Sequence, residues 1–152
     1  MAPIADIIFL LDTSSDTDKR FPRMANTEDR ARTILVVEDY DDIRELMRHH
    51  LGKRGYEVIT ASNGEDAVIL AERVRPDLIL MDISLPERSG ISATYKILKS
   101  PSLSGTPVVA VTGFTNADLH QDALDAGCRA VYLKPLTPEG LEEILALYMP
   151  SE

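Results

Sequence analysis

The stretch that decides the fold is DLILMDISLPERSG, which runs from Asp77 to Gly90. It begins as an apolar run of strand character and stops on a carboxylate, Asp82. Aspartate is a poor strand former, and its charge is costly to bury. The stretch therefore indicates a buried strand whose last residue has a use that outweighs this cost.

Four other segments share the strand character of this one, and each strand is followed by a segment with helical periodicity. The continuous Ile-Leu-Val-Val of the first predicts a strand covered on both faces, as in a parallel sheet. The five predicted strands are TILVVED (33–39), EVITA (57–61), DLILMD (77–82), TPVVAVTG (106–113) and AVYLKP (130–135).

The first predicted helix carries a stripe of residues at positions i, i+3, i+4, i+7 and i+8, which we expect to face the core. This stripe consists of Ile43, Leu46, Met47, His50 and Leu51. The later helices are predicted within 63–76, 90–100, 116–127 and 137–149. Asn63 and Thr137 are suitable N-caps, Pro138 suits the first helical position, and Gly127 suits a left-handed helix end.

Five strands that alternate with five helices predict an α/β fold of the (βα)5 type. Right-handed crossovers then give a doubly wound parallel sheet with helices on both sides. Ligands of such sheets bind beyond the carboxyl ends of the strands. The unusual polar residues of this sequence are expected at that edge.

Four predicted strands end in polar groups that would share this edge: Glu38 and Asp39, then Asp82, Thr112 and Lys134. Three carboxylates brought together repel one another unless positive charge compensates them. The Lys134 ammonium and a hard divalent cation would both serve. Mg²⁺ fits because it takes oxygen ligands and is commonly held by one or two carboxylates together with phosphate oxygens.

Composition excludes several classes of function. The chain has 152 residues, enough for one globular domain with a proper core, and a formal net charge of −9. That charge argues against binding to nucleic acid or to an anionic membrane. No apolar run approaches the roughly 20 residues of a membrane helix. The single cysteine fits a reducing compartment, so we expect a cytoplasmic protein.

Residues 1–31 differ in character from the rest and are expected to be a flexible N-terminal extension to a domain at 32–150. Ile4 to Leu11 is apolar, but it lacks the basic flank and cleavage site of a signal peptide. The following segment is rich in charges and turn formers, as in a solvated linker. Met24 as the natural start, and docking of Ile4 to Leu11 on the domain, remain open alternatives.

From Thr33 to Met149 the sequence resembles the response regulator receiver domains of two-component signalling. The resemblance rests on the acidic pair in VVED, on LMDISLP with Gly90 eight residues after Asp82, on Thr112 and on the terminal Lys134-Pro135. It implies a flavodoxin-like strand order of 2-1-3-4-5. It also implies a non-enzymatic phosphoprotein of the single-domain type, because the sequence stops after the fifth helix without an output domain.

The resemblance implies that Asp82 is the phosphoacceptor, whose carboxylate attacks phosphorus and becomes an acyl phosphate. Asp39, Asp82 and the backbone carbonyl of Ser84 are then implied to hold Mg²⁺, and Glu38 to act through the metal shell or a bound water. The implied phosphodonor is a histidine kinase or a phosphotransfer protein.

The remaining two site residues have implied roles once phosphate is present. Lys134 would pair with one phosphoryl oxygen, and the Thr112 hydroxyl would donate to another. The Lys134-Pro135 peptide bond is implied to be cis. A contact made in one state only can shift an equilibrium, so phosphorylation is expected to switch the binding of a downstream protein through the fourth helix, fifth strand and fifth helix.

One departure from the family pattern suggests an alternative function. Family members usually carry an aromatic residue three before the lysine, where this chain has Val131; strand alternation should point Tyr132 to the other face. A degenerate receiver that binds a partner without phosphorylation is therefore the alternative. A phosphohydrolase with an aspartate nucleophile would need a second aspartate at the position of Ser84.

Overall fold

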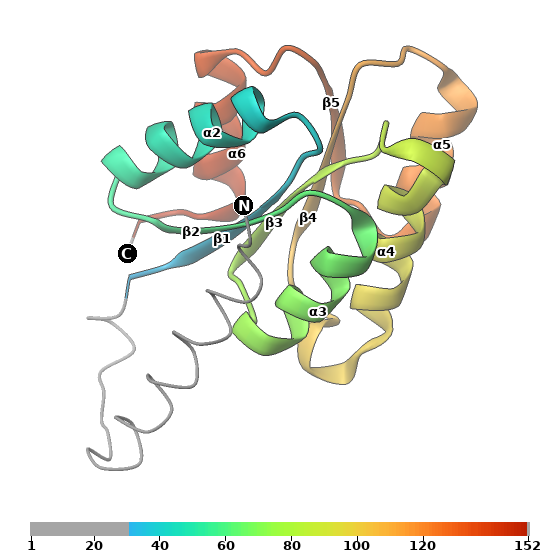
Figure 1. Cartoon of the computed structure of the whole chain (residues 1–152), viewed down its shortest axis with the longest axis horizontal. Helices are drawn as coiled ribbons and strands as arrows, with labels where there is room; N and C mark the ends of the chain where they lie inside the picture. Colours follow the sequence, from blue (N-terminus) through green and yellow to red (C-terminus); the bar gives the residue numbers. More distant parts are fainter. Residues whose placement is uncertain (1–30, 152) are drawn as a thin grey trace.

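The structure, a computed structural model that describes residues 31–151, is a five-stranded sheet with helices on both faces (Figure 1). The strands are β1 (Thr33–Val37), β2 (Glu57–Ala61), β3 (Leu78–Asp82), β4 (Val108–Thr112) and β5 (Ala130–Leu133). The helices are α2 (Asp41–Lys53), α3 (Gly64–Val74), α4 (Ser89–Lys99), α5 (Ala117–Ala126) and α6 (Pro138–Tyr148). Two short 3-10 helices, η1 (Pro86–Arg88) and η2 (Pro101–Leu103), flank α4. The apolar segment from Ile4 to Leu11 lies outside the described residues.

The strand order is β2-β1-β3-β4-β5, and all neighbouring strands are parallel. Both the (βα)5 fold and the implied order are confirmed. The chain moves from β1 to β2 on one side and then returns to place β3 on the other side of β1. This reversal leaves a crevice beyond the carboxyl ends of β1 and β3, which is where sheets of this kind bind ligands.

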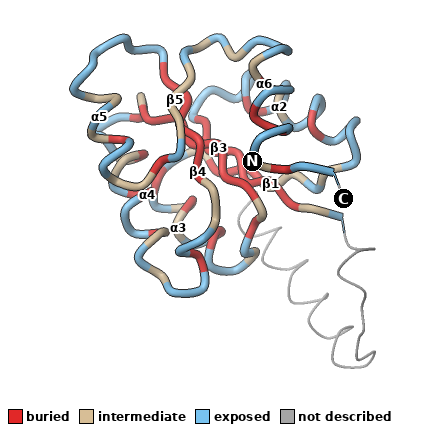
Figure 2. Tube along the Cα trace, turned by 180° about the vertical axis from the view of Figure 1, so that it is seen from behind, coloured by how far each residue is buried: buried red, intermediate tan, exposed pale blue. Residues whose placement is uncertain are grey.

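The two faces of the sheet bury separate hydrophobic clusters, because side chains alternate along each strand. Leu35 and Val37 of β1 face the cluster formed with α3, α4 and α5. Ile34 and Val36 face the cluster formed with α2 and α6. β1, β3 and β4 are buried along their whole length (Figure 2). The central strands therefore form a rigid base for the residues at their ends.

The predicted helix ends are confirmed. Asn63 Oδ1 accepts a hydrogen bond from the Asp66 amide at 2.8 Å, and Thr137 Oγ1 accepts one from the Gly140 amide at 2.9 Å. Pro138 is the first residue of α6, and Gly127 closes α5 with a φ of 119°. These caps satisfy backbone groups that helix ends leave without partners.

The predicted inner face of α2 is wrong in part. Leu51 is buried and Met47 packs on the core, but Ile43 is 37% and Leu46 54% exposed, and His50 is exposed as well. The inner position in the first turns of α2 belongs to Arg44, which is 5% exposed. Hydrophobic periodicity missed it because an arginine is buried only where its polar head finds partners.

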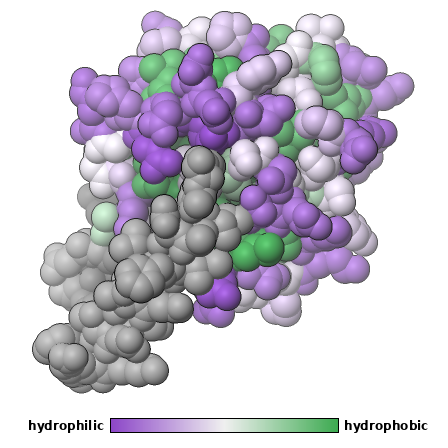
Figure 3. Space-filling view, in the orientation of Figure 1, coloured by the Kyte–Doolittle hydropathy of each residue, from purple (hydrophilic) through white to green (hydrophobic). Residues whose placement is uncertain are grey.

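Figure 3 shows many hydrophilic side chains on the coloured part of one face, with hydrophobic side chains in separate patches between them. None of the helices within residues 31–151 is long and apolar enough to cross a membrane.

Gly90 provides a test of how closely α4 packs on the end of β3. A Cβ atom at this position would lie 2.4 Å from the carbonyl oxygen of Asp82 and 3.0 Å from Ile83 Cα. Backbone atoms cannot move aside as a flexible side chain can, so Gly90→Ala is expected to lower the free energy of unfolding by about 1–3 kcal/mol. Urea denaturation measures this change.

Gly52→Ala is the matched control, since Gly52 is also helical and a Cβ there meets nothing within 4 Å. It should raise stability by roughly 0.5–1 kcal/mol, because alanine loses less backbone entropy on folding. Equal effects of the two substitutions would contradict the close approach of α4 to β3.

Candidate phosphoacceptor and metal site

Two acidic residues follow β1 directly. Glu38 is 4% exposed, whereas the neighbouring Asp39 is exposed to solvent. The Glu38 amide donates to the carbonyl of Ala61 at the end of β2 (3.0 Å), and Glu38 Oε2 accepts from the Tyr40 amide (3.1 Å). These contacts hold the acidic pair at the carboxyl edge of the sheet, beside the end of β3.

Asp82 is the last residue of β3 and is 3% exposed. Its Oδ1 atom accepts two hydrogen bonds from Ser84, one from the amide at 2.8 Å and one from the hydroxyl. A buried carboxylate is stable only when it is hydrogen-bonded or paired with a cation. Ser84 satisfies one oxygen, and the other is left for Lys134.

Lys134 follows β5 and supplies the compensating positive charge. Its amide donates to the Thr112 carbonyl at 2.7 Å, which ties the end of β5 to the end of β4. Its Nζ atom lies 2.8 Å from Glu38 Oε1 and 2.9 Å from Asp82 Oδ2. The Lys134-Pro135 bond is cis, as the family resemblance implied. The ammonium thus bridges the ends of β1 and β3.

Thr112 is fully buried at the end of β4. Its Oγ1 atom accepts a hydrogen bond of 3.0 Å from the Phe114 amide. The hydroxyl is therefore held by the loop that leads into α5.

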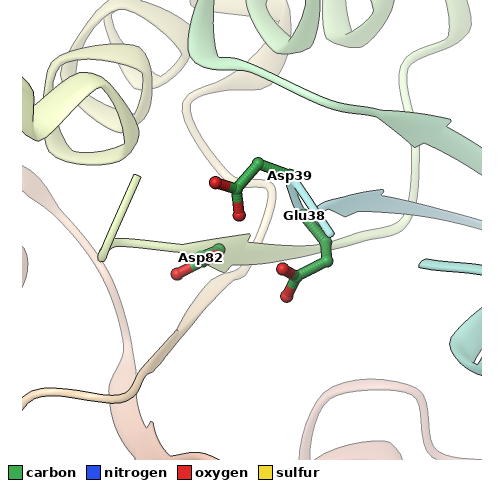
Figure 4. A group of neighbouring side chains, drawn as sticks. All are labelled: Glu38, Asp39 and Asp82. Atoms are coloured by element: carbon green, nitrogen blue, oxygen red, sulfur yellow. The ribbon is translucent and has the colours of Figure 1, made fainter. Parts of the chain in front are cut away.

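The three acidic side chains form one cluster, in which a carboxylate oxygen of each lies within 4.8 Å of the others. Figure 4 shows Glu38 and Asp39 beside Asp82 at the adjacent strand end. The three carboxylates carry more negative charge than the Lys134 ammonium can neutralise, and the cluster is open to solvent on the side of the exposed Asp39. Hard oxygen ligands with excess negative charge are the donor set that suits Mg²⁺. Glu38, Asp39 and Asp82 could therefore hold this ion.

Comparison with known protein families assigns most of the described chain. Residues 34–146 match the response regulator receiver domain, which is more than half of the 152 residues. The chain belongs to this family. The homologous receiver proteins are phosphoacceptor response regulators, and receiver domains in general are signalling modules without enzymatic activity of their own.

Individual receivers resemble the chain over most of their length. The polar-differentiation response regulator DivK of Brucella anthropi is 36% identical over 118 residues, which cover 78% of this chain and 96% of DivK. The chemotaxis protein CheY4 of Vibrio cholerae superposes with a TM-score of 0.73 at 28% identity, over 78% of this chain and 99% of CheY4.

A third receiver bears on the metal site. The receiver domain of the sensor histidine kinase PA1611 from Pseudomonas aeruginosa superposes with a TM-score of 0.73 at 33% identity. The match covers 80% of this chain and 100% of that domain. Its crystal structure holds a magnesium ion coordinated in the active site cleft.

Burial and ion pairing shift the pKa values of two residues of this site, Glu38 and Lys134. Burial raises the pKa of Glu38 above 4.5, although hydrogen bonds from Lys134 and the Tyr40 amide oppose the shift. Burial would lower the pKa of Lys134, but its bonds to Glu38 and Asp82 outweigh this and raise it above 10.5. Lys134 therefore remains charged at neutral pH.

The Glu38 shift affects stability in a defined direction. Its pKa in the folded protein lies above that of the unfolded chain, so the folded state binds the proton more tightly. The contribution of this group is fully present below pH 4.5 and is lost as the pH rises through the folded pKa. At neutral pH an ionised Glu38 thus depends on a cation.

The departure at Val131 has the structural consequence predicted from strand alternation. Val131 packs on the cluster under α3, α4 and α5, whereas Tyr132 packs on the cluster under α2 and α6. Sequence analysis missed two other neighbours of the site, Arg44 and Tyr40. Tyr40 is 65% exposed, and its ring centroid lies 6.0 Å from Lys134 Nζ. Its position directly after the acidic pair was the available signal.

Replacement of Lys134 tests its role as the cation of the site. Lys134→Met leaves Glu38 and Asp82 buried without their partner, so it should lower the free energy of unfolding of the metal-free protein by about 3–5 kcal/mol at pH 7. The loss should shrink as the pH falls towards 5, because protonation of Glu38, whose pKa burial raises, removes part of the charge that Lys134 neutralises.

Urea unfolding at pH 7 and pH 5 measures both effects. Lys96→Met is the control, because Lys96 is exposed on α4 and makes no ion pair within residues 31–151. A loss for Lys134→Met that is small, or that does not change with pH, would mean that Lys134 is not the essential counter-charge.

Proposed function

We propose that this receiver accepts a phosphoryl group on Asp82 from a phosphohistidine of a histidine kinase or a phosphotransfer protein. The Asp82 carboxylate attacks phosphorus, a bond forms between its oxygen and phosphorus, and the bond between phosphorus and the histidine nitrogen breaks. The imidazole leaves with the electron pair of that bond. The observation that carries the proposal is the buried Asp82 carboxylate bonded to Lys134 Nζ at 2.9 Å.

Lys134 and Ser84 prepare Asp82 for this reaction in different ways. Ser84 holds Oδ1 through two hydrogen bonds and so fixes the orientation of the carboxylate. Lys134 is placed to neutralise the negative charge that a phosphoryl group would bring. It can do so without moving far, because it already lies between Asp82 and Glu38.

The acidic cluster is proposed to bind Mg²⁺ through Asp39, Asp82 and the Ser84 carbonyl, with Glu38 in contact directly or through water. When bound, the ion would neutralise charge on the phosphoryl group and help to align it with Asp82. The donor set of the cluster supports this proposal, as does the magnesium ion in the PA1611 receiver domain.

Thr112 is proposed to convert phosphorylation into a change of shape. Its hydroxyl now accepts a hydrogen bond of 3.0 Å from the Phe114 amide. After phosphorylation it would leave this amide and donate to a phosphoryl oxygen. Because this contact would exist in the phosphorylated state alone, it would bias the equilibrium between two conformations. The face formed by α5, β5 and α6 is the proposed surface for a downstream protein.

The proposed domain comprises residues 32–150, with residues 1–31 as an extension. Arg32 supports this boundary, because its guanidinium donates to the carbonyls of Met149 (3.0 Å) and Pro150 (2.9 Å). We further propose that the protein is not an enzyme and acts in the cytoplasm. The buried free thiol of Cys128 is compatible with that reducing compartment.

Val131 favours one alternative, a degenerate receiver that binds its partner without phosphorylation. Mass spectrometry after incubation with Mg²⁺ and a small acyl phosphate separates the two functions. The phosphoacceptor function predicts one added phosphoryl group, which Asp82→Asn abolishes and Asp42→Asn, an exposed control on α2, retains. Mg²⁺ binding without an adduct would instead support the degenerate receiver. Repeated turnover of a phosphate ester would indicate a phosphohydrolase.

Thr112→Val separates phosphorylation from the switch, since valine keeps the volume and removes the hydroxyl. The variant should still form the adduct. However, the difference in amide hydrogen exchange at Phe114 between the phosphorylated and unphosphorylated proteins should disappear. Persistence of a wild-type difference would show that Thr112 does not transmit phosphorylation to this loop.

A further inference from the structure

Arg44 is a buried charge that the proposed chemistry does not use. Its side chain is 6% exposed on the inner face of α2. One terminal nitrogen, Nη1, donates to the Glu38 carbonyl at 2.9 Å, and the other pairs with the carboxylate of Asp41. Burial of a guanidinium is costly unless it is paired and hydrogen-bonded, and Arg44 has both kinds of partner. The bond to the Glu38 carbonyl links Arg44 to the backbone of the acidic pair.

The Glu38 carbonyl lies just beyond the end of β1 at Val37. The Glu38 amide is held by the Ala61 carbonyl of β2, and Arg44 holds the carbonyl from the opposite element, α2. A buried carbonyl needs a partner, and this one belongs to the peptide group that joins Glu38 to Asp39. The orientation of that peptide sets the direction in which Asp39 leaves the strand.

We propose that Arg44 is a positioning residue for the acidic pair, and that it sets the affinity of the site for a divalent cation by fixing the Glu38–Asp39 peptide. The inference rests on the proposed function of the cluster as a Mg²⁺ site. Groups that hydrogen-bond to metal ligands and orient them strongly alter the affinity for the metal, although they do not touch the ion. Arg44 acts here through a backbone carbonyl.

The charge of Arg44 has the opposite effect, because a cation near the site repels Mg²⁺. Asp41, 84% exposed, is paired with Arg44 and offsets much of this repulsion. The two effects predict different results for two variants. Positioning predicts that both Arg44→Lys and Arg44→Met weaken binding, since neither can make the forked contact. Repulsion alone predicts tighter binding for Arg44→Met and no change for Arg44→Lys.

The experiment is a calorimetric titration of the metal-free full-length protein with MgCl₂. Arg44→Met and Arg44→Lys are each expected to raise the Kd about tenfold. Arg48→Met is the matched control: Arg48 lies one turn further along α2, and it donates to Thr60 Oγ1 of β2 at 3.0 Å instead of to the acidic segment. Its Kd should stay within about twofold of the wild-type value, which is well inside the tenfold effect expected for Arg44.

Hydrogen exchange in the absence of metal gives a second measurement. The Tyr40 amide donates to Glu38 Oε2, so this amide should exchange faster in both Arg44 variants than in the wild type. It should not exchange faster in Arg48→Met. The proteins are compared under conditions in which their global stabilities are equal. Should Arg44→Met fail to fold, Arg44→Lys keeps the charge and most of the stem. A wild-type Kd in Arg44→Lys, or tighter binding by Arg44→Met, would overturn the inference.

The two proposals can fail separately. If the wild type binds Mg²⁺ in an Arg44-dependent manner but forms no acyl phosphate, the phosphoacceptor function fails and the role of Arg44 stands. If the wild type is phosphorylated on Asp82 and the Arg44 variants bind Mg²⁺ normally, the positioning role fails and the phosphoacceptor function stands.

Discussion

The structure depends on one interaction, the ammonium of Lys134 between two buried carboxylates. Nζ lies 2.8 Å from Glu38 and 2.9 Å from Asp82, and both acids are almost inaccessible to solvent. Burying two carboxylates without a positive partner would be costly. The ammonium therefore compensates the charge at the ends of β1 and β3. The same low dielectric environment strengthens the attraction of the cluster for any further cation.

The fold makes this arrangement possible because the residues that stabilise the protein are not the residues of the acidic site. The three central strands are buried along their length between two hydrophobic clusters (Figure 2). That core supplies the stability that the acidic edge lacks. Because all strands are parallel, their carboxyl ends meet at one edge, and residues distant in sequence come within hydrogen-bonding distance there.

Contacts around the site differ in how firmly they are fixed. The Glu38 backbone is held on both sides, by β2 and by Arg44. The Thr112 hydroxyl, in contrast, is held by one hydrogen bond from the Phe114 amide. The proposed switch would use this difference: Thr112 would exchange its hydrogen-bond partner while the Glu38 backbone stays held.

The sequence by itself determined the strands, the helix caps and the set of residues at the sheet edge, because these follow from local patterns: apolar runs, capping residues and polar groups where runs stop. It did not determine the inner face of α2, where Arg44 takes a position expected for an apolar residue. Hydrophobic periodicity cannot identify a buried arginine, since its burial depends on partners brought close by the fold. Only the tertiary structure placed the Glu38 carbonyl within reach of that guanidinium.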